Sequence, residues 1–175
     1  TDAIERLTIQ FGTSMCYPIS SFGAHVAARP RTSLKTRGNV AMCGTFGYEL
    51  DPRKLTDDEK AEVKQQIADY RKYHRLVREG DFYRLVSPTE NDFYCAWEFV
   101  SPDKQEAMMT AVVMRQPETR YCVQRLRGLD PKTYYQDEET GTVYSGAMLM
   151  NAGLNLTRDV YEDGTSVTKH FKAVK

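Results

Sequence analysis

Apolar residues recur at helical spacing near the start of the chain. Ile4, Leu7, Phe11 and Met15 follow one another in steps of three and four, which places them on one helix face. Asp2 precedes this stripe and can cap the free backbone N–H groups of the first turn. We therefore predict a helix that begins at Thr1 or Asp2 and ends before Pro18.

The most complete helix signal lies between residues 56 and 80. Thr56 and Glu59 form a T-x-x-E capping box, and Gly80 follows the last periodic residue as a candidate C-terminal cap. An apolar stripe with spacings of four and three runs between them. Its members are Val63, Ile67, Tyr70, His74 and Val77, so His74 is expected to pack in the core.

Shorter segments alternate with these two helices. Residues 22–28 and 45–50 are short apolar runs bounded by turn residues such as Arg29-Pro30 and Asp51-Pro52, and we predict that both are strands. Thr32 or Ser33 can cap a helix over residues 33–43 between them. The order helix, strand, helix, strand, helix predicts a parallel α/β unit over residues 1–80.

After Gly80 the hydrophobic period changes from helical to the two-residue period of strands. Turn signals, including Ser101-Pro102-Asp103 and Gln116-Pro117, recur about every ten residues, which is typical of an antiparallel sandwich. Residues 149–156 fit either a loop or a helical turn. The predicted strands are Phe82–Val86, Phe93–Val100, Ala107–Arg115, Tyr121–Arg127, Thr133–Asp137, Thr142–Met148 and Thr165–Val174.

Composition narrows the class of protein. The 175 residues carry 24 Lys and Arg against 24 Asp and Glu, with 41% hydrophobic residues, as expected of a globular domain. The zero formal charge argues against nucleic acid or an anionic membrane as partner, and no apolar run is long enough to span a bilayer. The start at Thr1 lacks a signal-peptide pattern, and we expect it to be an internal cut in a longer chain.

The four cysteines are widely spaced, with no CxxC pair and no His/Cys cluster. Zinc, or any other metal, is therefore not expected. Two disulfides are possible, but four thiols in a reducing, cytoplasmic compartment are favoured, because the neighbours of these cysteines are apolar.

A series of short words in the first half resembles a known family. The words are Asp2-Ala3-Ile4-Glu5-Arg6-Leu7, Tyr17-Pro18-Ile19-Ser20, Gly23-Ala24-His25-Val26, Thr36-Arg37 with Asn39-Val40-Ala41-Met42, and Gly44-Thr45-Phe46-Gly47-Tyr48-Glu49-Leu50-Asp51. Together they resemble the C-terminal part of bacterial α-galactosidases of glycoside hydrolase family 36, the melibiase type. The resemblance continues more weakly into the second half, at Arg84-Leu85 and from Trp97 to Val100.

This resemblance implies a fold and an activity. Residues 1–80 would be the last strands and helices of a (β/α)8 catalytic barrel, and residues 81–175 a C-terminal antiparallel β-domain. The parent enzyme would release terminal α-linked galactose from oligosaccharides such as melibiose and raffinose, with retention, without a cofactor, and as a cytoplasmic homo-oligomer. The 175 residues alone are expected to be inactive, because they would supply two of eight barrel strands.

The family chemistry uses two carboxylates. The nucleophile belongs to a Lys-Trp-Asp word that this sequence lacks. The acid/base belongs to a Ser-Asp-x-Thr-Asp word, of which Thr1-Asp2 are the last two letters, so the resemblance places it about two residues before Thr1. Asp2 is thus more simply a helix cap than a catalytic carboxylate, although the catalytic or supporting role stays open.

His25 and Glu49 are the candidate substrate-binding residues. His25 lies near the end of one predicted strand and Glu49 ends the other, and barrel active sites gather at such ends. A polar residue satisfied inside the fold is the plainer reading of His25, and Asp51 is expected to form a turn.

Two alternative functions stay open. The second half could be a non-catalytic module that binds carbohydrate or mediates oligomer contacts, using aromatic residues such as Phe93, Tyr94 and Trp97, although we expect these rings to fill the core. The same fold could also transfer galactose to a sugar instead of to water.

Overall fold

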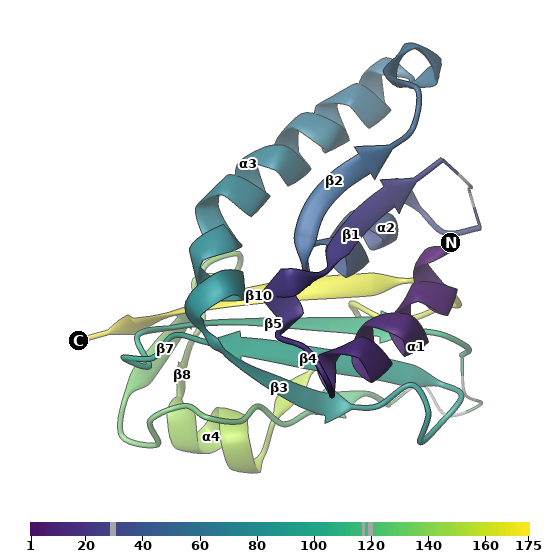
Figure 1. Cartoon of the computed structure of the whole chain (residues 1–175). Coiled ribbons are helices and arrows are strands. Elements are labelled where there is room, and N and C mark those ends of the chain that lie inside the picture. The colour runs from purple at the N-terminus through teal and green to yellow at the C-terminus, as the bar shows by residue number, and fades with distance from the viewer. Residues whose placement is uncertain (29–30, 117, 119–120) are drawn as a thin grey trace.

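A computed structural model describes residues 1–28, 31–116, 118 and 121–175 (Figure 1). The predicted turn at 29–30 lies outside the described residues, as does the proline of the turn at 116–117. The helices are α1 (Ala3–Ser14), α2 (Leu34–Ala41), α3 (Asp57–Glu79) and α4 (Gly146–Asn151), with 3-10 turns at Ile19–Ser21 and Pro52–Lys54. The strands are β1 (Gly23–Ala27), β2 (Thr45–Glu49), β3 (Asp81–Val86), β4 (Tyr94–Val100), β5 (Glu106–Val113), β6 (Val123–Gln124), β7 (Tyr134–Asp137), β8 (Val143–Ser145), β9 (Leu154–Asn155) and β10 (Ser166–Val174).

The strands form a parallel pair and a larger antiparallel sheet. β1 pairs with β2 in parallel, while six strands follow the order β3-β4-β5-β10-β7-β8 with antiparallel neighbours. A small antiparallel pair, β6 and β9, completes the second half. The predicted fold class, α/β followed by all-β, is confirmed.

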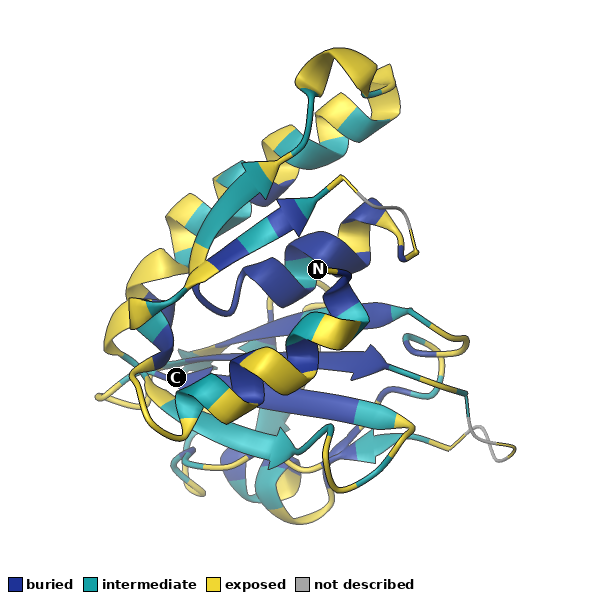
Figure 2. Ribbon diagram, turned by 45° about the vertical axis from the view of Figure 1, so that its right-hand side comes forward, coloured by how far each residue is buried: buried dark blue, intermediate teal, exposed yellow. Residues whose placement is uncertain are grey.

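Helix α2 is the middle layer of the first half. It contacts β1 on one side and β5 and β10 on the other (Figure 1). Ala41 belongs to the core shared with β1 and β2, and Val40 to the core shared with the large sheet. Because both of its faces are covered, six of its eight residues are buried, as the colouring of Figure 2 shows.

The large sheet is buried on both faces. Along β4, Trp97 and Phe99 point toward the helices, while Ala96, Glu98 and Val100 point the other way, as the two-residue period of a strand requires. Trp97 is only 1% exposed and meets Phe11 of α1 edge-on, with ring centroids 6.3 Å apart. Trp97 is therefore a core residue, as expected.

Ion pairs connect α3 to the large sheet. Glu138 accepts hydrogen bonds from Lys72 of α3 at 2.6 Å and from Lys172 of β10 at 2.7 Å. Partial burial alone would raise the pKa of Glu138, but these bonds lower it to about 2. His170 lies between this carboxylate, at 2.6 Å, and that of Glu106, at 2.5 Å.

The sequence predicts the N-terminal end of α3 better than its C-terminal end. The capping box of Thr56 and Glu59 is present with both of its hydrogen bonds. Gly80 follows the helix but has an extended backbone, not a left-handed one. A Cβ atom there would lie 2.5 Å from the carbonyl oxygen of Leu76 and 3.0 Å from that of Val100. Gly80 is thus required by close backbone approach.

The prediction that His74 packs in the core is wrong. His74 is exposed and bonds to the Arg71 carbonyl oxygen, while Gln66 is buried in its place. At 3.6 residues per turn the members of the stripe stay within about 80° of one another, so the spacing alone does not expose His74. It is exposed because whether a helix position is covered depends on the elements packed against it. Gln66 is accepted in the interior because Leu34 and Tyr48 satisfy its amide.

The predicted strand Thr142–Met148 is also partly wrong. β8 ends at Ser145, whose hydroxyl accepts a hydrogen bond from the Met148 N–H and caps α4. Serine is a preferred N-terminal cap of helices, and here that preference prevailed over the two-residue hydrophobic period that predicted a strand. The ambiguous segment 149–156 contains the end of α4 and then β9.

Glu98 is fully buried beneath the loop that follows β6. Its Oε2 accepts a hydrogen bond from the Arg127 N–H at 2.8 Å, and its Oε1 has no partner within the described residues. Burial raises the pKa of Glu98 to about 8, and the bond from Arg127 offsets only part of that effect. The carboxyl therefore holds its proton at neutral pH in the folded state.

This raised pKa predicts a pH dependence of stability. In the unfolded chain the carboxyl ionises near its ordinary value of 4.5, so the stabilisation that it contributes is complete below that pH. The contribution is lost progressively as the pH rises toward about 8. Glu98→Gln keeps the shape and stays neutral, so we expect it to raise the free energy of unfolding by about 1–3 kcal/mol at pH 9.

Urea unfolding of both forms between pH 5 and pH 9 measures this effect. The matched control is Glu90→Gln, which removes an exposed carboxylate. If the difference in the free energy of unfolding between Glu98→Gln and the wild type were the same at every pH, the raised pKa of Glu98 would be contradicted.

Candidate functional site

The candidate site is the open face of the β1–β2 pair. Ala24 and Val26 point toward α2 and are fully buried. His25 is therefore directed to the opposite face, as successive residues of a strand must be. In β2, Glu49 lies on the same face, because its register partner is Ala27, two residues after His25. Within the described residues, β1 and β2 pair only with each other.

The two predicted substrate-binding residues are brought together on this face. His25 Nδ1 lies 3.4 Å from Glu49 Oε1, and their side chains are 40% and 61% exposed. Both therefore remain available to a ligand. An imidazole and a carboxylate side by side can donate and accept hydrogen bonds, which is what a hydroxyl-rich ligand requires.

Two glycines make room for the imidazole ring. A Cβ atom on Gly47, the register partner of His25, would lie 2.9 Å from His25 Cδ2. A Cβ on Gly23 would lie 3.2 Å from His25 Cε1. The ring lies across both glycines, so a larger residue at either position would compete with it for space.

Asp2 caps α1 in the structure. Its Oδ2 accepts a hydrogen bond from the Ile4 N–H at 3.1 Å, and the residue is only 7% exposed. The capping role predicted for Asp2 is confirmed, and its burial leaves little access for a substrate. Its second oxygen, Oδ1, is buried and has no partner within the described residues.

Sequence reasoning gave no role to the buried arginine of α2. Arg37 donates a hydrogen bond to the Ala27 carbonyl oxygen at the end of β1, at 2.5 Å, and is 9% exposed. Arg6 of α1 donates to the Gly23 carbonyl oxygen at 3.5 Å. The two guanidinium groups hold both ends of β1. An arginine close to the small residues Gly38 and Ala41 in a short helix was the signal that could have identified Arg37.

The rim beyond β2 is a turn, as predicted. Asp51 accepts hydrogen bonds from the Arg53 N–H at 3.0 Å and from its guanidinium at 2.9 Å. The guanidinium contact holds the pKa of Asp51 below its ordinary value. In the part of the chain that the structure describes, no three His, Cys, Asp or Glu side chains are grouped as a metal site would need.

Comparisons with known proteins define the class. A family model described as melibiase matches residues 1–80, and one described as the glycosyl hydrolase family 36 C-terminal domain matches residues 94–171. The chain is thus built like part of a glycoside hydrolase. It belongs to glycoside hydrolase family 36.

Individual relatives agree with the family. The bifunctional alpha-galactosidase/sucrose kinase AgaSK of Mediterraneibacter gnavus is 45% identical over 89% of this chain. The alpha-galactosidase AgaA of Geobacillus stearothermophilus is 50% identical over 89% of the chain. The chain spans 17% of the first relative and 22% of the second.

Solved structures show the same arrangement of the backbone. The galactosidase domain of AgaSK matches 99% of this chain with a TM-score of 0.94 and 42% identity, and the chain covers 25% of it. A variant of AgaA in complex with raffinose matches 99% of the chain with a TM-score of 0.92 and 46% identity, again over 25% of that structure.

The glycines under His25 generate a prediction. Gly47→Ala should push the imidazole away from Glu49, because the new methyl group would overlap the ring edge. We expect a stability change below about 1 kcal/mol, since the displaced group is the end of an exposed side chain. The His25 ring signals in an NMR spectrum, or a crystal structure, would report the displacement.

Gly12→Ala is the matched control, because a Cβ at Gly12 has nothing within 4 Å. This control should leave the His25 signals in place. Unchanged His25 signals in Gly47→Ala would refute the close packing.

Proposed function

We propose that this chain is the C-terminal part of a retaining α-galactosidase. The enzyme would release terminal α-linked galactose from oligosaccharides such as melibiose and raffinose. The observation that carries the proposal is the match over 99% of the chain, at 46% identity, to an α-galactosidase variant crystallised with raffinose. A stachyose complex of another variant of that enzyme matches with a TM-score of 0.91.

In this proposal the chain divides into two parts. Residues 1–80 close a (β/α)8 barrel, with β1 and β2 as its last two strands, and residues 81–175 are a C-terminal β-domain. The parallel register of β1 and β2, with helices on one face only, supports the first assignment. Further barrel strands would pair with the outer edges of β1 and β2, which pair with no other strand of the described residues.

The residues of this chain would bind substrate and not carry the covalent chemistry. Retaining hydrolysis needs a nucleophilic carboxylate and an acid/base carboxylate about 5–5.5 Å apart. We assign the acid/base to the stretch that precedes Thr1 in the relatives' pattern, and Asp2 to the helix that positions it. His25 and Glu49 face the barrel interior in this proposal and hydrogen-bond sugar hydroxyls.

The compartment and the assembly are also part of the proposal. All four cysteines are free thiols, which fits a reducing cytoplasm better than an oxidising compartment. No helix of the described chain is long and apolar enough to cross a membrane. The exposed Ile9, Met15 and Tyr17 of α1 and the turn after it would be covered by the rest of the enzyme or by a second copy in a homo-oligomer.

Hydrolysis of nitrophenyl α-galactoside tests the activity. We expect turnover from a polypeptide of the relatives' length that contains this chain, and none from the 175 residues alone. NMR can show which anomer of galactose is released first, and release of the α-anomer would establish retention of the anomeric configuration. Turnover by the 175 residues at an ordinary enzymatic rate, or first release of the β-anomer, would refute the proposal.

Substitutions at the open face test the substrate contacts in that longer polypeptide. Loss of a hydrogen bond to a sugar hydroxyl costs about 1–2 kcal/mol, so His25→Ala and Glu49→Gln should each lower kcat/KM about 5- to 30-fold. Most of the change should be in KM if the contact is equally strong in the ground and transition states.

The control is Glu79→Gln, an exposed carboxylate that pairs with Arg75 at the far end of α3. It should leave both kinetic constants unchanged. Kinetics of His25→Ala and Glu49→Gln that match those of this control would remove the two residues from the site.

A further inference from the structure

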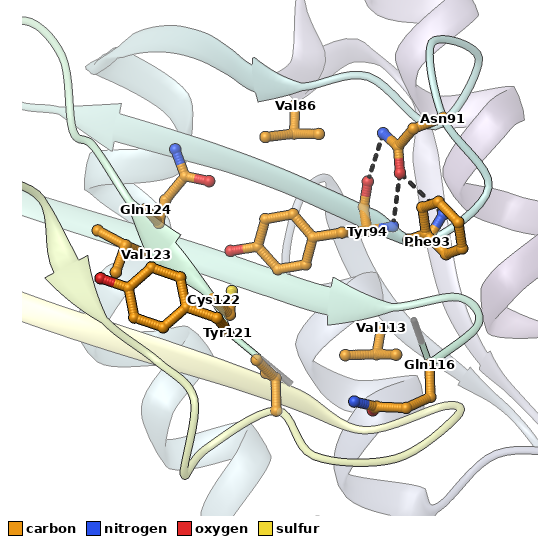
Figure 3. A pocket seen from close by; sticks show the side chains of 11 residues that line it. Val86, Asn91, Phe93, Tyr94, Val113, Gln116, Tyr121, Cys122, Val123 and Gln124 are labelled. Atoms are coloured by element: carbon orange, nitrogen blue, oxygen red, sulfur yellow. Dashed lines mark hydrogen bonds between the residues drawn. The ribbon is translucent and has the colours of Figure 1, made fainter. Parts of the chain in front are cut away.

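A cavity of about 330 Å³ lies in the antiparallel half of the chain. Its walls come from the sheet face that is turned away from α1, α2 and α3, and from the segment before β6 (Figure 3). The apolar part of the wall includes Val86, Val113, Cys122 and Val160. None of its lining residues belongs to the β1–β2 site, so it is a separate feature of the molecule.

Two polar atoms in this cavity lack hydrogen bonds. Tyr94 Oη and Gln116 Oε1 are buried and have no partner within the described residues. The Cys122 thiol is close enough to the Tyr94 hydroxyl for each to shift the pKa of the other, but a thiol is at best a weak hydrogen-bond partner. A buried polar atom without a partner costs about 1–3 kcal/mol, so both atoms would gain from a ligand that bonds to them.

The other amides of the wall are already used. Asn91 accepts from the N–H groups of Phe93 and Tyr94 and donates to two carbonyl oxygens. Gln124 donates to the Arg125 carbonyl oxygen at 2.7 Å. The buried polar atoms left without a partner are therefore the Tyr94 hydroxyl and the Gln116 amide oxygen.

The charge of the wall restricts the ligand further. None of the described lining residues carries a carboxylate, an ammonium or a guanidinium group. Burial also raises the pKa of the Tyr94 phenol, which stays neutral. Among the described lining residues, a phosphate, a carboxylate or an amine would find no counter-charge to offset the hydration it loses, which favours a neutral ligand.

An aromatic ring stands at the mouth of the cavity. Tyr121 lines it and is 73% exposed, which leaves a ring face available for stacking. Phe93 is less available, because the Arg115 guanidinium lies 4.9 Å from its ring centroid. A neutral ligand with an apolar face for Tyr121 and hydroxyl groups for Tyr94 and Gln116 has the chemistry of a pyranose ring.

We propose that this cavity is a binding site for one pyranose ring of a neutral sugar. The inference goes beyond the proposed function, because it requires binding only and no catalysis. It assigns the second half of the chain a ligand of its own, on the sheet face opposite the helices. The proposal can fail while galactoside hydrolysis is present, and the reverse also holds.

Thiol modification gives a readout specific to this cavity. Cys122 lines it, whereas Cys16 is exposed elsewhere and serves as an internal reference. The protein is treated with methyl methanethiosulfonate at pH 8.5, with and without melibiose, and the two cysteines are followed by peptide mass spectrometry. At ten times Kd we expect modification of Cys122 to slow about tenfold and that of Cys16 to stay constant.

Matched variants and ligands distinguish the possible occupants. Tyr94→Phe should fold normally and weaken the protection of Cys122, and in the polypeptide of the relatives' length it should leave galactoside hydrolysis unchanged. Tyr134→Phe, which removes an exposed hydroxyl outside the cavity, should protect like wild type. Sorbitol, an acyclic polyol without a ring face, should not protect.

Three outcomes would overturn the proposal. The first is equal protection in Tyr94→Phe and wild type. The second is protection by toluene but by no sugar, which would make the cavity a purely apolar one. The third is a Cys122 that is unreactive without any ligand in the folded protein and reactive in urea, which would show that the cavity is closed.

Discussion

The structure depends on one apolar contact, the packing of the first-half helices against the six-stranded sheet. Phe11 of α1, Val40 of α2 and Leu76 of α3 meet on the same surface, which Trp97 and Phe99 of β4 provide. Helix α2 lies between the β1–β2 pair and the sheet, and contacts β1 on one side and β5 and β10 on the other. The position of His25 and Glu49 is therefore set indirectly, through a helix that is covered on both sides. The two halves share a core and are not independent units joined by a linker.

Charge reinforces the same contact at its edge. Lys72 of α3 and Lys172 of β10 converge on Glu138, and His170 joins Glu138 to Glu106. Such a network adds directional bonds to the apolar contact, as do the hydrogen bonds of Thr36 and Asn39 to Ser166 of β10. On the opposite sheet face the balance differs, because Glu98 is buried there with a single hydrogen bond and Tyr94 with none among the described residues. The helix-facing side of the sheet thus carries a network of ion pairs, while the opposite side holds a buried carboxyl and a buried phenol with few hydrogen bonds.

Much of the fold could be predicted from local patterns, and the failures have physical reasons. The cap at Asp2, the capping box at Thr56 and both parallel strands were predictable, because each depends on neighbours within a few residues. His74 could not be placed by its spacing, since whether a helix position is covered depends on the elements packed against it. Of the candidate site, His25 and Glu49 were predicted individually, but their 3.4 Å contact requires the register of two strands. Arg37 and the cavity around Tyr94 depend on contacts between distant segments, which no local pattern encodes.

The passage from α3 to β3 has a mechanical consequence. Gly80 is the single residue between the last turn of α3 and the first residue of β3, and two backbone carbonyl oxygens lie too near it to admit a Cβ atom. A one-residue junction with so little free space restricts the rotation of α3 relative to β3. Helix α3 in turn contacts β2 through Tyr70, whose ring stacks on Phe46. A displacement of β3 would therefore also displace α3 and, through it, β2, the strand that carries Glu49.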